Sequence, residues 1–289
     1  MNLLLALLCN AQAQNEPEKK GDAEKYSLVW NFKQGQTRDF SWGGESSSEG
    51  TFGSNTLPKT HLEYNMIGTL TVNAVGEDGS ATGELVLHDY RFQGFIPKET
   101  DIQIENSVLK HPSGPLNEET KKRVESLLAP LKVKIDRRGN LELAGPNPMV
   151  KTNGLWDLTM GPILPWKKRV SVGDSWMGKV QSHEMKATDQ PGFSVEYTFA
   201  EALEMNGRKC ARLTMSSKQM IRFKVWEGSL PVDASLSAKS EGLFDYEEGI
   251  CILDNVSGVV STDAVYQGKK WISTLSFRQA CAYLPPKKQ

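Results

Sequence analysis

Histidine is the side chain best suited to bind a metal or to transfer protons near neutral pH, and this chain has four. None has a second histidine within one helical turn; they are His61, His88, His111 and His183. His183-Glu184 begins like the zinc-binding motif His-Glu-x-x-His, but Ala187 occupies the fifth position. Because the second imidazole must stand one turn later on the same helix face, no local metal site is predicted.

Nucleophilic chemistry has one weak candidate, Ser107 with Lys110, which matches the Ser-x-x-Lys pattern. A lysine at this spacing can deprotonate a serine. That chemistry also needs a Ser-Asp-Asn element, which is missing, and a Lys-Thr-Gly element, which residues 151–154 match only in part. The Gly-x-Ser-x-Gly, phosphate-loop and Gly-x-Gly-x-x-Gly motifs are missing as well. We therefore expect no catalytic residue, no metal site and no cofactor, and we leave the ligand-binding residues unassigned.

The cysteines and tryptophans fit packing better than chemistry. No two cysteines have Cys-x-x-Cys spacing, and the pairing of Cys210, Cys251 and Cys281 stays open between one disulfide and three buried thiols. Large aromatic residues in β proteins mostly fill the core, although they can also line an apolar cavity. The tryptophans in question are Trp30, Trp42, Trp166, Trp176 and Trp226.

The first residues predict export. Residues 3–8 form an apolar run, and Ala11-Gln12-Ala13 offers a small-x-small cleavage site, so we assign residues 1–13 to a signal peptide and 14–24 to a flexible leader. The protein is then extracytoplasmic, either periplasmic or secreted. Lipid anchoring at Cys9 is the lesser alternative, because Leu8 stands where a lipoprotein signal has a small residue. No other stretch is long enough for a transmembrane segment.

The charge balance argues against nucleic acid as a partner. The formal net charge is -1 and the isoelectric point is near 6.5, so the chain has no general attraction for phosphates. Two short basic runs, residues 121–123 and 167–169, are read as solvated faces, with contact to a partner as the alternative.

Hydrophobic periodicity predicts mainly β-strands. Residues 61–75 alternate apolar and polar, Asp78-Gly79 suits a tight turn, and residues 81–92 return as a second strand. Asn206-Gly207 predicts another hairpin between 195–205 and 210–215, and further hairpins are expected at 132–143 and 242–253. Residues 43–54 are rich in Gly, Ser and Glu and are read as a flexible loop, with a mobile lid as the alternative.

One amphipathic helix is expected at residues 117–129, where apolar residues recur with helical spacing, Asn117 suits the N-cap and Pro130 marks the exit. Similar landmarks recur in two stretches, which we predict to be an N-terminal β half at 25–145 and a C-terminal β half at 155–285. The expected fold is mainly β, with two tandem antiparallel curved-sheet, half-barrel-like halves and one packed helix.

The string Ile-Leu-Pro-Trp-Lys-Lys-Arg-Val-Ser-Val-Gly-Asp-Ser-Trp at 163–176 resembles a segment of uncharacterised secreted proteins of bacterial envelopes. Residues 26–35 and 242–249 are similar to the same group, some of whose members resemble the lipoprotein-carrier (LolA/LppX-like) architecture. The resemblance implies export and an open or half-barrel β fold, and it implies no activity and no catalytic residue.

The first functional hypothesis is thus a non-enzymatic, exported binding or envelope-interaction protein whose ligand and partner are unknown. The alternative is a carrier of lipid or another apolar ligand in a cavity of the curved sheet. A third is a hydrolase whose carboxylates come together from distant strands.

Overall fold

The computed structural model describes residues 24–94, 102–105, 108–110, 129–143, 161–167, 169–180, 192–225, 230–266 and 268–285. This part of the chain is all β and contains no helix. Its strands are β1 Thr37–Phe52, β2 Asn55–Val75, β3 Ala81–Gly94, β4 Ile102–Glu105, β5 Val108–Lys110, β6 Leu131–Ile135, β7 Leu141–Leu143, β8 Ser175–Val180, β9 Phe193–Met205, β10 Arg208–Val225, β11 Leu230–Asp245, β12 Ile250–Tyr266 and β13 Lys269–Leu284.

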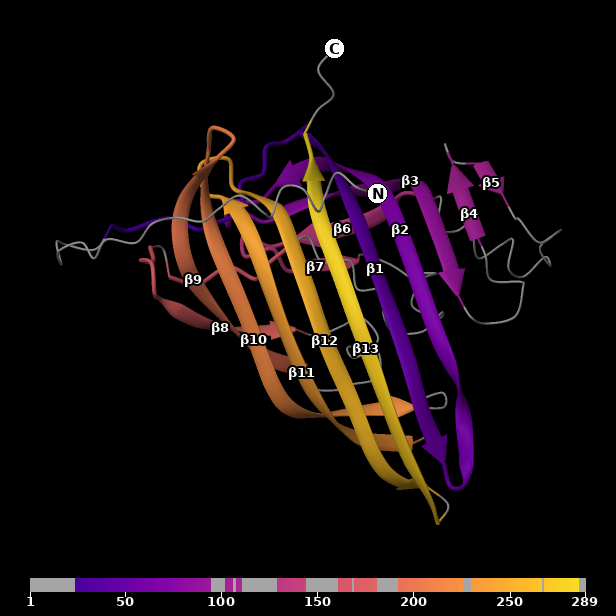
Figure 1. Cartoon of the computed structure of the whole chain (residues 1–289). Coiled ribbons are helices and arrows are strands. Elements are labelled where there is room, and N and C mark those ends of the chain that lie inside the picture. Colours follow the sequence, from indigo (N-terminus) through magenta and orange to yellow (C-terminus); the bar gives the residue numbers. More distant parts are fainter. Residues whose placement is uncertain are drawn as a thin grey trace.

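A single antiparallel sheet replaces the two expected halves. Its order is β5-β4-β3-β2-β1-β13-β12-β11-β10-β9-β8, with β6 and β7 attached beside β3. The strand nearest each end of the chain lies in the middle, where indigo β1 runs beside yellow β13 (Figure 1). Their ladder extends from Asp39 opposite Leu284 to Phe52 opposite Trp271. The expectation of two tandem halves is therefore wrong, because the pairing of β1 with β13 joins both stretches into one sheet.

The expected packed helix is also corrected. The described structure is all β, and residues 117–128 of the expected helix lie outside the described residues. Ala129 and Pro130 lead directly into β6. The expected signal peptide at 1–13 and nearly all of the expected leader at 14–24 lie outside the described residues too. No helix in the described part is long and apolar enough to cross a membrane.

The residue types at the turns explain the hairpins, and the hairpins predicted from the sequence are confirmed. β9 and β10 are joined by Asn206 and Gly207, whose φ angles of 54° and 74° are those of a tight hairpin turn. β2 and β3 meet at Asp78-Gly79, while β6–β7 and β11–β12 form the two shorter predicted turns.

The packed core occupies one end of very long strands. β2 has 21 residues and so spans roughly 70 Å, whereas an average strand has about six residues. The larger core cluster is built on Phe40, Trp42, Phe199 and Phe244, all with no exposed surface. Segments outside the main strands close it, through the bridge of Tyr26 with Val170 and other backbone hydrogen bonds.

Most of the Gly/Ser/Glu tract at 43–54 belongs to β1, so its interpretation as a flexible loop or lid is wrong. Gly44 pairs with Tyr64 of β2, and a Cβ atom added at Gly44 would lie 2.6 Å from the tyrosine ring. The missing side chain at Gly44 leaves space for this ring, which reaches over from β2 and supplies apolar surface that the tract itself lacks at that position.

Candidate functional site

The two faces of the sheet differ in character. We call the face that carries Phe40 and Trp42 the inner face, and the opposite face the outer face. On the outer face the same strand presents Asp39, Glu45 and Ser47. Cross-strand pairs place side chains of neighbouring strands on the same face, so the alternation of β1 extends across the sheet.

The six central strands continue well past the core, toward the lower end in Figure 1. We call this part the distal half. It comprises residues 45–52 of β1, 55–63 of β2, 217–225 of β10, 230–238 of β11, 258–266 of β12 and 269–277 of β13. The ladders of β1 with β13, β10 with β11 and β12 with β13 run unbroken through these segments, whereas β1 with β2 shifts register between Ser48 and Gly50.

The inner face of the distal half carries a strip of apolar side chains, interrupted by polar ones such as Ser217, Gln219 and Thr262. On β11, Val232, Ala234 and Leu236 are at most 4% exposed, yet they belong to neither core cluster. On the neighbouring strands the inner side chains are only half-buried: Ile221, Val260, Leu275, Phe277 and Leu62. The alternation therefore continues beyond the core and forms a second apolar strip. Its side chains are buried on β11 and half-buried on the other strands.

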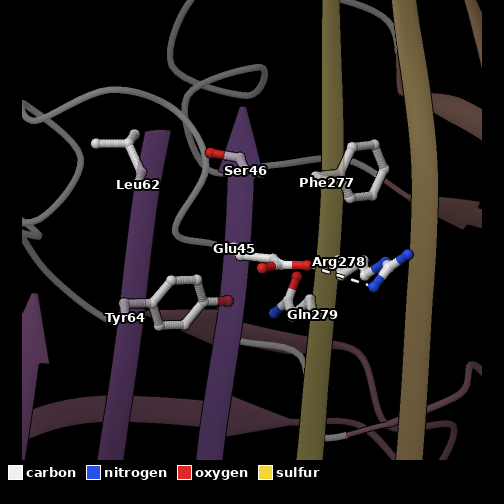
Figure 2. A pocket seen from close by; sticks show the side chains of 7 residues that line it. All are labelled: Glu45, Ser46, Leu62, Tyr64, Phe277, Arg278 and Gln279. Atoms are coloured by element: carbon white, nitrogen blue, oxygen red, sulfur yellow. Dashed lines mark ion pairs between the residues drawn. The ribbon is translucent and has the colours of Figure 1, made fainter. Parts of the chain in front are cut away.

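A small hollow lies at the boundary between the core and this strip (Figure 2). It is lined by inner-face residues of three strands, namely Ser46, Leu62, Tyr64, Phe277 and Gln279, together with Glu45 and Arg278. Its volume of about 30 Å³ is enough for water but not for an organic molecule. A larger apolar ligand would have to extend from the hollow along the strip.

Two glycines allow the aromatic rings around the hollow to lie close to the sheet. The ring of Tyr64 crosses above Gly44, and the ring of Phe277 crosses above Gly258, where an added Cβ would lie 2.5 Å from a ring carbon. Burial raises the pKa of the Tyr64 hydroxyl well above its ordinary value, so it stays neutral near pH 7. The hollow is thus walled by flat aromatic rings and an uncharged hydroxyl.

Charge at the hollow is confined to the outer side of the sheet. Glu45 and Arg278 form an ion pair of 3.5 Å, drawn as a dashed line in Figure 2, and both side chains are substantially exposed. Such exposed pairs contribute little stability, about 0–1 kcal/mol. None of the inner-face residues of the apolar strip named above carries a formal charge.

The outer face has two wider depressions. One has a volume of about 610 Å³ and is lined mainly by serines and by Glu45, His61, Lys239 and Arg278. The other, of about 650 Å³, involves Glu49, Lys59 and Thr274. Lys59 is paired with Glu49 at 2.8 Å, and both side chains are largely exposed. Both are open to solvent; Val259 and Phe277 also line the first, and Pro58 also lines the second.

The structure separates the histidines that sequence reasoning considered. His61 lies on the outer face of β2 opposite Ser47, and His88 lies on β3 with its Nε2 2.7 Å from Thr69 Oγ1. His111, His183, Ser107 and Trp226 lie outside the described residues, while Lys110 ends β5. Within the described part, no three His, Cys, Asp or Glu side chains are grouped to hold a metal.

The cysteines and most tryptophans pack as apolar residues. Cys210, Cys251 and Cys281 are free and buried, which settles the pairing left open by the sequence. Burial raises the pKa of each thiol, to about 11 for Cys210. Trp30 and Trp42 are buried, and the prediction that they fill the core is confirmed. Trp166 is the exception at 80% exposed.

A buried carboxyl group escaped sequence reasoning. Asp254 on β12 is 4% exposed and faces inward beside Cys281, its partner on β13. Burial raises its pKa to about 7, opposed by a hydrogen bond with Ser240. Its Oδ1 has no hydrogen-bond partner among the described residues. A raised pKa in an apolar interior means that the group is largely protonated below neutral pH.

Comparison with known proteins gives no family. No family model matches the sequence, and no curated protein matches it, so the resemblance to secreted envelope proteins gains no support from these searches. Among solved structures, lipovitellin, in a structure concerned with its lipid–protein interactions, is similar with a TM-score of 0.44 and 11% identity over 90% of this chain. DynF from the dynemicin biosynthesis pathway of Micromonospora chersina is similar with a TM-score of 0.24 and 8% identity, over 95% of this chain and 96% of DynF.

This chain spans only 26% of the length of the lipovitellin chain. Both TM-scores lie below 0.5, and we base no functional conclusion on either likeness.

Proposed function

We propose that the protein binds an elongated apolar ligand of the acyl-chain type along the inner face of the distal half. The observation that carries this proposal is the half-buried apolar strip of Val260, Leu275 and Phe277, which continues the inner face beyond the core. The part of the strip that remains exposed is unfavourable in water, and a bound chain would cover it.

Size and shape favour a chain over a compact ligand. The hollow at Tyr64 is small, whereas the strip follows the strands for many residues. Each methylene removed from water contributes about 0.8 kcal/mol, so about sixteen of them contribute roughly 13 kcal/mol, from which association takes at least about 4 kcal/mol. We therefore expect micromolar affinity for long chains and roughly tenfold weaker binding for every two methylenes removed.

The proposed role is binding and transfer without covalent chemistry. Support comes from the strip, whose named inner side chains are apolar and carry no nucleophile or acid–base pair. We further propose that binding takes place outside the cytoplasm, and the support for export is the apolar run and cleavage site in residues 1–13.

Val260 and its neighbour Val259 provide a matched test, because adjacent residues of one strand point to opposite faces. Val260→Lys places a charge in the apolar strip, and Val259→Lys places the same charge on the outer face, where Val259 is already 38% exposed. Titration with a dansyl-labelled fatty acid measures binding. We expect Val260→Lys to weaken it at least tenfold, since a bound chain would bury the charge, and Val259→Lys to change it less than twofold.

Circular dichroism and thermal melting establish that both variants are folded. If the wild-type protein does not bind the probe, or if both valine variants lose affinity equally, the inner face is not the binding surface.

A further inference from the structure

Trp166 is the most exposed large apolar side chain in the described part of the chain, at 80%. It follows Ile163 and Leu164, which are at most 9% exposed and packed in the core clusters. A tryptophan that packs normally buries 150–250 Å², so leaving this one in water is unfavourable. Its exposed ring is therefore available for contact with a partner surface.

The Trp166 ring packs against a buried arginine. The guanidinium carbon of Arg138 lies 4.2 Å from the centre of the Trp166 ring, while Arg138 itself is only 8% exposed. Arg138 Nε donates to the Leu164 carbonyl at 2.7 Å, and the Leu164 amide donates to the Arg138 carbonyl at 2.9 Å. Trp176 Nε1 donates to the Ile163 carbonyl at 2.8 Å. The exposed ring thus sits on a fixed support.

Positively charged residues lie next to Trp166 and Arg138 along the chain. Arg137, Lys167 and Arg169 are exposed, and none of them forms an ion pair with another described residue. The nearby carboxylate of Asp136 is engaged inside its own turn, where it accepts from the Arg138 and Asn140 amides and from the Asn140 side chain. We call Trp166, Lys167, Arg169 and Arg137 the Trp166 surface.

We propose that the Trp166 surface docks the protein on an anionic lipid membrane. An indole ring is suited to the boundary between headgroups and acyl chains, and lysine and arginine side chains extend toward anionic headgroups. A hydrophobic protein partner would need only the tryptophan ring. The cations without counter-ions favour a negatively charged surface instead. This docking goes beyond the binding of an apolar ligand and does not depend on it.

Flotation with lipid vesicles tests the proposal on the full chain. Vesicles of phosphatidylcholine alone are compared with vesicles containing phosphatidylglycerol, at low and high salt. We expect binding to the anionic vesicles only, weakened by salt. Trp166→Ala should reduce binding about tenfold or more, and the double variant K167E/R169E at least about 25-fold, because each of the two cations near the membrane is worth roughly a factor of five.

The control is the double variant K218E/K239E, which reverses the same number of exposed charges on the outer face of β10 and β11 and should retain nearly full binding. K167E/R169E changes only exposed side chains, so it tests the surface even if Trp166→Ala melts earlier. Equal binding to neutral vesicles, no binding to anionic vesicles, or equal losses in both double variants would overturn the proposal. Binding of the dansyl fatty acid without vesicles should be unchanged in Trp166→Ala, so the two proposals can fail separately.

Discussion

Asp254 lies in the apolar interior, with Cys281 opposite it on β13 and Gly242 opposite it on β11. Tyr197 and Cys251 are the other titratable groups close enough to interact with it, and burial raises the pKa of both. Sequence analysis could not find this carboxyl group, because its burial depends on strands that are distant along the chain. The same analysis recognised Trp42 as core, since aromatic residues rarely pack elsewhere in β proteins.

The raised pKa of Asp254 makes stability depend on pH. The unfolded chain releases this proton near pH 4 and the folded chain near pH 7, so the folded state binds more protons between these values. The free energy of unfolding should therefore fall as pH rises from about 4 to 7, by up to roughly 4 kcal/mol from this group. Asp254→Asn should remove this fall and be more stable than the wild-type protein at pH 8.

Urea unfolding at pH 5 and pH 8 measures the effect. Asp263→Asn is the control, because Asp263 is exposed and forms only a surface ion pair with Lys270, at 3.2 Å. If Asp254→Asn and the wild-type protein lose the same stability between the two pH values, Asp254 does not titrate as described.

The strands differ in whether residues nearby in the sequence or residues on distant strands determine them. The hairpins of β2–β3 and β9–β10 were predicted from a turn dipeptide between two alternating runs, and short-range geometry is enough to specify them. β1 was missed because its inner positions at Gly44, Ser46 and Gly50 carry little apolar surface. The Tyr64 ring covers Gly44, and no pattern within residues 43–54 reveals that ring.

Adjacent glycines of β1 test this explanation. Gly44→Ala places a Cβ 2.6 Å from the Tyr64 ring and 2.7 Å from the Arg278 carbonyl oxygen, whereas Gly43→Ala meets nothing closer than 3.7 Å. We expect Gly44→Ala to lower the free energy of unfolding by about 1–3 kcal/mol and Gly43→Ala to be neutral or slightly stabilising, because alanine is less flexible in the unfolded chain. Chemical denaturation of both variants checks this, and equal stability would refute the close packing at β1.

At the scale of the whole molecule, the pairing of β1 with β13 decides the architecture. Similar landmarks in the two stretches of sequence suggested two halves, but a ladder between residues more than 200 positions apart leaves no local signal. That ladder places long strands side by side and gives the inner face its second apolar strip. The candidate binding surface could not be predicted either, because its residues come from six strands.

Photo-crosslinking with a diazirine-labelled fatty acid, followed by mass-spectrometric mapping of the adducts, tests the proposed binding face most directly. Adducts should concentrate on inner-face residues of the distal half, such as Val260, Leu275 and Phe277, and unlabelled fatty acid should compete them away. Adducts confined to exposed outer-face residues such as Val259 and Ile272, or labelling that unlabelled fatty acid does not reduce, would contradict the account.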